Sequence, residues 1–381
     1  MPDTIIRLDP EIIIGADTIN RAGALCSYRG RKVLVATELS LYENNHIERL
    51  LKVLEDSALE TILFDEVHGQ ATAELSDTIA SLARGARCDI ILGFGGLKTQ
   101  YIAKLACILA ASDLGLFDVL DGRKEESACL SYAAIPVAGG DPFLLSDKLV
   151  AIDPRDRQIK MIKCPRFLSR TVVLDPSISE LISGDFAPTA AFDGFCCALE
   201  AYCSVKSNFF SDALLEQAIS LYAKMILTDR ENITPDFTGH FVNAELLMAL
   251  GASVSTPGIG TALAYSLNSK FPVAKSWCAT ILLPYVMEKL IAVRPEKMAK
   301  VAAFMGDITD GTSRAEAANM SVDIVRRRMG QLSVPARLKD FDLPLDRLFP
   351  VAEAARGLEF VASSPWTVSS EDAYDLLKQA F

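Results

Sequence analysis

Residues 90–104 read IILGFGGLKTQYIAK, an apolar strand-like run that passes through three glycines directly into a helix-like segment. A strand that enters a helix through glycine is typical of nucleotide-binding α/β domains. Gly95 and Gly96 let backbone N–H groups approach a ligand closely, and the N-terminus of the following helix attracts a phosphate. The same pattern also fits close packing of a strand against a helix with no ligand, so both interpretations stay open.

Strands and helices alternate on both sides of this glycine turn. Strand-like runs lie at 32–37, 61–64, 89–93, 133–137, 149–152 and 171–174, and helical spacing at 45–55, 73–85 and 99–111. This alternation predicts right-handed βαβ units and a mostly parallel sheet. Long helical segments follow at 188–206, 211–227, 242–252, 277–292, 314–332 and 370–381. We therefore predict an α/β domain over 1–175, which is the candidate nucleotide-binding domain, and an all-helical domain over 176–381.

Composition narrows the class of function. The 381 residues include 38 Lys and Arg against 49 Asp and Glu, a net charge of −11, which argues against a nucleic-acid or anionic-membrane surface. No apolar run approaches the ~18 residues of a membrane span, and the N-terminus lacks the layout of a signal peptide. Nine scattered cysteines in mostly apolar contexts indicate reduced thiols. These features predict a cytoplasmic protein whose partner is neither a nucleic acid nor a membrane.

The glycine stretch also resembles the signature of the iron-containing alcohol dehydrogenases. The resemblance continues along nearly the whole chain, through FDGFCCALEAY at 192–202, GIG at 258–260 and ILLPYVM at 281–287. It implies a dehydroquinate synthase-like fold, in which an NAD(P)-binding domain precedes a helical metal-binding domain and the active site lies between them. It also makes a homodimer possible.

The resemblance suggests a set of cofactor-binding residues. An acidic residue is common after the family's first strand, and Glu38 stands there in this chain. A carboxylate at that position accepts ribose hydroxyls and repels a 2′-phosphate, which favours NAD over NADP. The alternative is that Glu38 is a solvated loop residue. The predicted cofactor-binding residues are Glu38, Gly95, Gly96, Lys98 and Thr99.

The chain departs from the family where the resemblance places a metal ion. Of the family's one Asp and three His ligands, the Asp is kept as Asp193, and the His positions fall on Cys197, Leu263 and Lys275. The chain holds three His in total, with none after His240. Leucine has no lone pair, and lysine would have to lose its proton to bind a cation. We therefore expect the iron or zinc site to be lost.

An alternative keeps a metal through exchanged ligands. Asp193 and Cys197 lie one helical turn apart, and Cys278 follows the last ligand segment. Carboxylate and thiolate can both bind Zn²⁺. On an apolar helix, however, cysteines are ordinarily buried structural thiols.

Two interpretations of function follow. Without a Lewis acid, a substrate carbonyl still needs a positive or acidic partner, and Lys98, Tyr101 and Lys275 are the candidates. Taken singly, each also fits a purely structural role, and we expect Lys275 to be a surface residue. The chain is then a metal-independent NAD(H)-linked oxidoreductase, or a non-catalytic protein that keeps the fold to bind a ligand or partner. We favour the first because the glycine turn and Glu38 are compatible with a nucleotide.

Overall fold

The computed structural model describes residues 6, 10–42, 45–69, 71–123, 129–137, 139–163, 171–179, 186–229, 235–306 and 312–381. Most of the N-terminal stretch, where we expect no signal peptide, and Ala138 lie outside these residues. The chain divides into two compact units. The first, here called the α/β unit, comprises Arg7–Gly139 and Phe143–Ile182. The second, the helical unit, comprises Met1–Ile6, Gly140–Pro142 and Ser183–Phe381.

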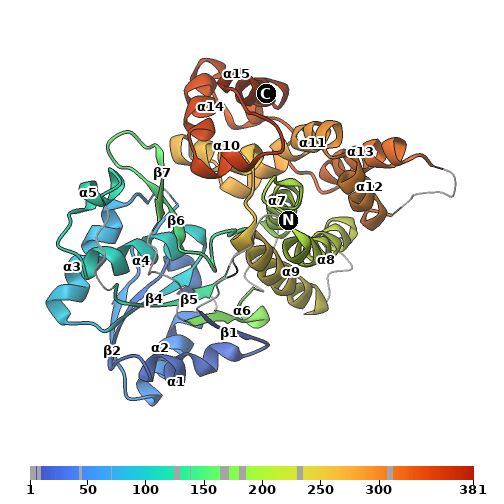
Figure 1. Ribbon diagram of the computed structural model, residues 1–381. Helices are drawn as coiled ribbons and strands as arrows, with labels where there is room; N and C mark the ends of the chain where they lie inside the picture. Colours follow the sequence, from blue (N-terminus) through green and yellow to red (C-terminus); the bar gives the residue numbers. More distant parts are fainter. Residues whose placement is uncertain are drawn as a thin grey trace. The chain divides into compact units, whose positions relative to one another are not determined.

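The α/β unit is built on a parallel sheet of six strands in the order β1-β8-β5-β4-β2-β3 (Figure 1). The strands are β1 (Glu11–Ile14), β2 (Lys32–Ala36), β3 (Glu60–Phe64), β4 (Ile90–Gly95), β5 (Ser131–Pro136) and β8 (Thr171–Leu174). The predicted parallel sheet is confirmed. The expected strand at 149–152 lies instead in a separate antiparallel pair of β6 (Lys148–Ile152) and β7 (Ile159–Lys163).

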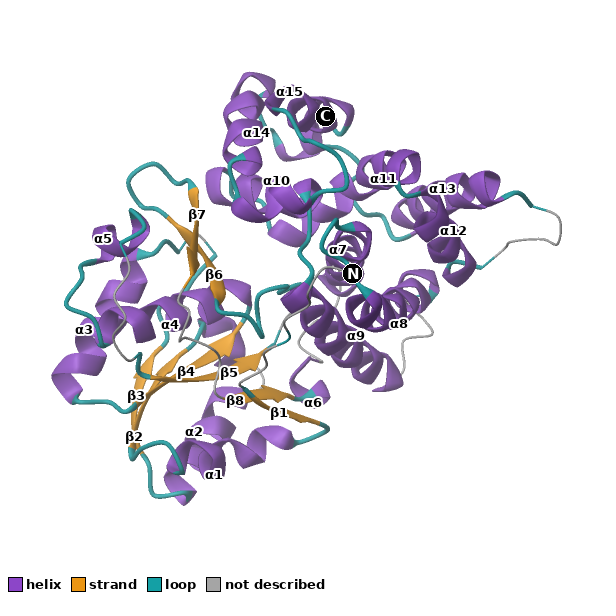
Figure 2. Ribbon diagram, in the orientation of Figure 1, coloured by secondary structure: helices purple, strands orange, loops and turns teal. Residues whose placement is uncertain are grey.

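Helices cover both faces of this sheet (Figure 2). Alternate side chains of β2 and β4, among them Val33, Val35 and Leu92, share a buried core with residues of the helices on one face. On the other face, a Cβ at Gly93 would lie 3.1 Å from the Ala103 side chain of α4, so glycine lets this helix pack closely. The helical elements of this unit are η1 (Thr18–Arg21), α1 (Ala22–Ser27), η2 (Leu39–Tyr42), α2 (His46–Asp56), α3 (Glu74–Ala86), α4 (Leu97–Ala110), α5 (Leu116–Leu120) and α6 (Pro176–Ser179).

The described residues of the helical unit form helices and connecting turns, which confirms the predicted fold class. Its central helix is α7, whose Phe192, Phe195 and Leu199 side chains are completely buried. Its elements are α7 (Phe186–Cys203), α8 (Phe209–Leu227), α9 (Pro235–Val254), α10 (Ile259–Lys270), α11 (Lys275–Val293), α12 (Pro295–Phe304), α13 (Arg314–Gln331), η4 (Leu338–Phe341), η5 (Leu345–Arg347), α14 (Leu348–Arg356), η6 (Glu359–Ser363) and α15 (Ser370–Gln379).

Helix α11 is long and apolar enough to cross a membrane. Its Cys278, Ile281 and Val286 side chains are fully buried inside the helical unit, however. A buried core helix of a globular protein has this same composition. We therefore interpret α11 as a core helix.

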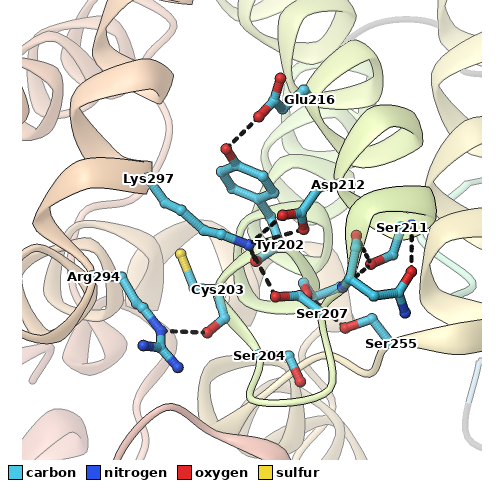
Figure 3. A network of polar contacts seen from close by, with 12 residues as sticks. Tyr202, Cys203, Ser204, Ser207, Ser211, Asp212, Glu216, Ser255, Arg294 and Lys297 are labelled. Carbon is cyan, nitrogen blue, oxygen red and sulfur yellow. Dashed lines mark hydrogen bonds and ion pairs between the residues drawn. The ribbon is translucent and has the colours of Figure 1, made fainter. Parts of the chain in front are cut away.

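Two cations hold the C-terminal end of α7 (Figure 3). Lys297 donates hydrogen bonds to the Tyr202 carbonyl at 2.6 Å and to the Asp212 carboxylate at 2.8 and 2.9 Å. Arg294 Nε donates to the Cys203 carbonyl at 3.3 Å. The last carbonyls of a helix lack partners within it, and positive charge there is favourable. The contacts fix α7, the helix that carries Asp193 and Cys197.

Candidate functional site

The glycine turn between β4 and α4 has the close backbone approach that its sequence predicts. Gly95 has φ +157°, and a Cβ there would lie 2.6 Å from Glu38 Oε1 and 2.7 Å from Thr99 Oγ1. Neither the backbone conformation nor the space accommodates a larger residue. The group that approaches the backbone is a carboxylate of the chain itself.

That carboxylate belongs to Glu38, which follows β2. Glu38 Oε1 accepts a hydrogen bond of 2.5 Å from the Gly96 backbone N–H, at the N-terminus of α4. Burial raises the pKa of Glu38, whereas the Gly96 N–H and the nearby Thr99 hydroxyl act to lower it. The half-buried side chain thus occupies a place where a helix N-terminus would attract a phosphate. The structure brings together Glu38, Gly95, Gly96 and Thr99 from the predicted cofactor set.

The other two candidates on α4 make different contacts. Lys98 Nζ donates a hydrogen bond to the Gly69 carbonyl. Desolvation, with a further contribution from Arg157, lowers the pKa of Lys98 to about 8. Tyr101 is buried, with 6% of its surface exposed. Lys98 therefore contacts another residue of the α/β unit, and Tyr101 has little contact with solvent.

Gln100 stabilises the glycine turn, and sequence reasoning missed it. Its Nε2 lies 3.0 Å from the carbonyl oxygens of Gly93 and Gly95, to which it donates, and Tyr132 OH donates to its Oε1 at 2.6 Å. These contacts tie the carbonyls at the end of β4 to α4; the Gly95 carbonyl also accepts from the Val137 backbone N–H at 3.2 Å. The available signal was an amide side chain four residues after Gly96 on an apolar helix.

A second cluster lies in the helical unit, around Lys275 and Asp193. Lys275 Nζ donates to both oxygens of Asp193, at 2.7 and 2.9 Å, and to the Gly140 carbonyl at 3.1 Å. Lys275 is 5% exposed and Asp193 is 3% exposed, so the expectation of a surface lysine is wrong. The three protons of the ammonium match these three acceptors.

The two charges of this pair shift each other's pKa. Desolvation, which lowers the pKa of Lys275, is outweighed by the adjacent Asp193 carboxylate, so the pKa of the ammonium lies well above its usual value. Burial raises the pKa of Asp193, and the Lys275 ammonium opposes that effect. Removing either partner would leave the other charge buried without a counter-charge, which is costly. The pair is therefore stable only while both groups stay in contact.

Gly140 connects this pair to a second buried acid. Its backbone N–H lies 2.8 and 2.7 Å from the two oxygens of Glu245, which also accepts from Tyr222 OH at 2.6 Å. Burial raises the pKa of Glu245 to about 7. Gly140 has φ +84°, and a Cβ there would lie 2.7 Å from Asp193 Oδ2. Sequence reasoning missed Gly140, Tyr222 and Glu245, although an acid in the apolar stretch 241–252 was a usable signal.

Glu200 is a further buried carboxylate in this unit. It accepts from the backbone N–H groups of Gly258, Gly260 and Thr261 at 3.1, 2.6 and 2.9 Å, and from the Thr261 hydroxyl at 2.7 Å. The Glu200 carboxylate thereby accepts four hydrogen bonds at the N-terminus of α10, and its negative charge is favourable there.

The donor set around Asp193 does not fit a divalent cation. The Asp193 oxygens are taken by the Lys275 ammonium, and Leu263 is buried with no lone pair to offer. Cys197 Sγ lies 3.8 Å from Lys275 Nζ, and burial raises the pKa of Cys197 to about 12, which disfavours the thiolate that metals bind. In the described part of the chain, no three His, Cys, Asp or Glu side chains gather as a metal would require. This geometry gives no support to zinc held by Asp193, Cys197 and Cys278.

The chain matches family models over both halves. Residues 9–176 match the model described as iron-containing alcohol dehydrogenase, and residues 188–381 match the C-terminal model of the Fe-containing alcohol dehydrogenase family. The chain is similar to the 1,3-propanediol dehydrogenase of Citrobacter freundii, with 25% identity over 96% of this chain and 96% of that protein.

Solved structures with the same fold cover the chain throughout. The crystal structure of a 1,3-propanediol oxidoreductase gives a TM-score of 0.90 with 22% identity, over 100% of both chains. A sulfoacetaldehyde reductase from Bifidobacterium kashiwanohense, solved in complex with NAD⁺, gives a TM-score of 0.85 with 14% identity, over 99% of this chain and 98% of that one.

Proposed function

The chain belongs to the iron-containing alcohol dehydrogenase family, and we propose that it is an oxidoreductase that works without the family's metal ion. Its reaction is hydride transfer between NAD(H) and a small alcohol, aldehyde or keto compound. The observation that carries this proposal is the buried Lys275 ammonium, 2.7 and 2.9 Å from the oxygens of Asp193. Asp193, the one retained member of the family's ligand set, thus contacts a cation that belongs to the chain itself.

In this proposal Lys275 supplies the positive charge that the substrate oxygen needs. Negative charge develops on a carbonyl oxygen as it accepts hydride, and a fixed cation in a dry site stabilises that charge. The raised pKa of Lys275 keeps the ammonium protonated at neutral pH. Its contact with the Gly140 carbonyl, at 3.1 Å, is the longest of the three, so this is the contact that a substrate oxygen replaces. We assign this role to Lys275 because it contacts Asp193, the retained member of the family's ligand set, whereas Lys98 donates to the Gly69 carbonyl.

The glycine turn supports NAD(H), which would carry the hydride, as the cofactor. Gly95 and the Gly96 backbone N–H open the start of α4 to a phosphate. The Glu38 carboxylate is an acceptor suited to ribose hydroxyls and unsuited to a 2′-phosphate. A structural neighbour solved with NAD⁺ supports the same assignment. Because Glu38 holds the Gly96 N–H, its side chain has to move before a phosphate binds there.

The second candidate is a non-catalytic protein that keeps the fold. It is favoured by one observation: the three protons of Lys275 already have acceptors inside the protein. Because all three protons are taken, the Lys275 ammonium polarises a substrate only after it gives up one of these internal hydrogen bonds. The two candidates therefore differ in whether Lys275 exchanges a partner.

One purified sample tests the proposal. Metal content is measured by mass spectrometry, NADH and NADPH binding by fluorescence titration, and turnover with short alcohols and aldehydes, each with and without a chelator. We expect no stoichiometric metal, tighter binding of NADH than NADPH, and turnover that the chelator leaves unchanged. Turnover that requires iron or zinc would overturn the proposal. NADH binding without any turnover would select the non-catalytic candidate.

We also propose a cytoplasmic location and a homodimer. The acidic net charge of −11 and the free, mostly buried thiols of the described residues support the location. Light scattering during size-exclusion chromatography checks the dimer, and a monomer mass across the working concentration range would contradict it.

A further inference from the structure

We propose that Glu38 is a tethered competitor for the anion that the glycine turn binds. Its carboxylate takes the Gly96 backbone N–H, so a ligand with a pyrophosphate group binds only after Glu38 swings away. The identity of that ligand as a dinucleotide rests on the proposed function. The competition between Glu38 and pyrophosphate does not.

The turn has more hydrogen-bonding capacity than Glu38 uses. Thr99 is 1% exposed, and its hydroxyl lies close enough to Glu38 to lower the pKa of that carboxyl, yet it makes no well-formed hydrogen bond among the described residues. Thr99 Oγ1 and Glu38 Oε1 lie 2.7 and 2.6 Å from the same point, the Cβ position that Gly95 leaves vacant. A buried hydroxyl that lacks a well-formed hydrogen bond is unfavourable, so Thr99 has capacity for a better-placed acceptor than the Glu38 carboxylate. An anion with several oxygens could accept from both the Gly96 N–H and the Thr99 hydroxyl.

Glu38 can leave this position because its backbone is fixed independently of its side-chain contacts. The neighbouring Thr37 backbone N–H donates to the Phe64 carbonyl at 2.8 Å, and Glu38 itself forms a backbone bridge with Glu66. The side chain is half-buried, so rotation about its own bonds carries the carboxylate toward solvent. Burial raises the pKa of Glu38, which means that the charged form gains from moving outward.

Glu200 provides a comparison, because it is a carboxylate that is firmly bound at a helix N-terminus of the same protein. It accepts from three backbone N–H groups and one hydroxyl at the start of α10, and it is 3% exposed. Glu38 has a single backbone donor at the start of α4 and stays half-buried. We infer that Glu200 is a structural cap and that Glu38 is exchangeable.

Once its carboxylate is displaced, Glu38 is expected to act differently on different ligands. Inorganic pyrophosphate has no hydroxyl to donate, so Glu38 acts on it only as a competitor. A dinucleotide also carries ribose hydroxyls, which the displaced carboxylate can accept. Pyrophosphate therefore isolates the competition, and NADH reports the combined effect.

The test measures binding of inorganic pyrophosphate by calorimetry to the wild type, Glu38→Gln and Glu66→Gln. Both variants remove one negative charge near the ends of β2 and β3, so the control accounts for the change in net charge. We expect Glu38→Gln to bind pyrophosphate about tenfold more tightly than the other two proteins, the effect of one charge-assisted hydrogen bond. Adding Gly95→Val to Glu38→Gln should abolish this gain, because the valine side chain fills the turn.

The outcomes separate this inference from the proposed function. Equal pyrophosphate affinity in Glu38→Gln and Glu66→Gln overturns the competition, as does a gain that survives Gly95→Val. Circular dichroism establishes that each variant is folded, and Glu38→Asp, with a shorter charged side chain, provides a second test that also predicts tighter binding. A gain with pyrophosphate while NADH binds none of the proteins leaves the competition standing and overturns the cofactor assignment.

Discussion

Two charged groups of this protein occupy positions at which an outside ligand would be expected, and they are held very differently. Lys275 is buried beside an opposite charge, with an acceptor for each of its protons. Glu38 is half-buried and holds a single backbone N–H. A desolvated charge beside its counter-charge is costly to remove, whereas a partly solvated charge with one backbone partner is cheap to remove. The free energy of unfolding should therefore change strongly when a charge of the Lys275–Asp193 pair is removed, and weakly when the charge of Glu38 is removed.

The largest effect is expected from Lys275→Met. This change leaves the Asp193 carboxylate buried without its counter-charge, which should cost about 3–5 kcal/mol in the free energy of unfolding. Urea denaturation measures it. The double variant Asp193→Asn with Lys275→Met removes both charges and should recover part of the loss. If the single variant costs under about 1 kcal/mol, the pair is not structural and the comparison fails.

Gly140→Ala should come next. At φ +84° an alanine strains the backbone, and its Cβ would meet Asp193 Oδ2 at 2.7 Å. We expect a loss of about 2–4 kcal/mol in the free energy of unfolding. Gly306→Ala is a matched control, because Gly306 has φ +76° with no described atom within 4 Å of the added Cβ. The difference between the two variants measures the contact with the ion pair alone, and equal losses would contradict that contact.

The buried acid Glu245 should make stability depend on pH. Its pKa is raised from 4.5 to about 7 by burial, so between these values the folded protein binds a proton that the unfolded chain releases. The stabilisation that Glu245 contributes is then fully present below about pH 4.5 and is lost as the pH rises through 7, a loss on the order of 3 kcal/mol. Glu245→Gln should flatten this decline in urea denaturation series between pH 5 and 8. The exposed Glu296→Gln should leave it unchanged, and a decline that persists in Glu245→Gln would assign it to another group.

The smallest effect is expected from Glu38→Gln. It replaces a charge-assisted hydrogen bond from the Gly96 N–H with a weaker one to a neutral amide oxygen, and it removes the cost of burying a charge, so the two changes partly cancel. We expect the free energy of unfolding to change by under about 1 kcal/mol, in either direction. A loss above about 2 kcal/mol in urea denaturation would place Glu38 with Lys275 and Glu200 among the structural charges.

Much of the fold could be predicted from local patterns in the sequence. The β-branched runs and the glycines of β4 gave a parallel sheet, since period and turn residues are local signals. The pattern missed β1, a short edge strand that is only partly buried, and α10, which is buried on nearly every side and so lacks an amphipathic period. It also missed β7, which converts the expected strand at 149–152 into half of an antiparallel pair.

The candidate site was predicted less completely because its contacts are long-range. Lys275 and Asp193 are 82 residues apart, and nothing in the residues around Lys275 indicates that it is buried. Glu38 and Gly96 were both placed at the cofactor site, but the sequence could not show that one would bind the other. The Gly140 carbonyl and N–H are backbone groups, which carry no sequence signal at all.

The anchoring of α7 has a consequence for the dynamics of the helical unit. The side chains of Phe192, Phe195 and Leu199 are fully enclosed, and Lys297 and Arg294 hold the last turn. Backbone amides in such a helix exchange with deuterium only when the surrounding helices separate. The slowest-exchanging amides of α7 should therefore report the global unfolding of this unit, and their exchange rate provides a label-free measure of its stability in the native state.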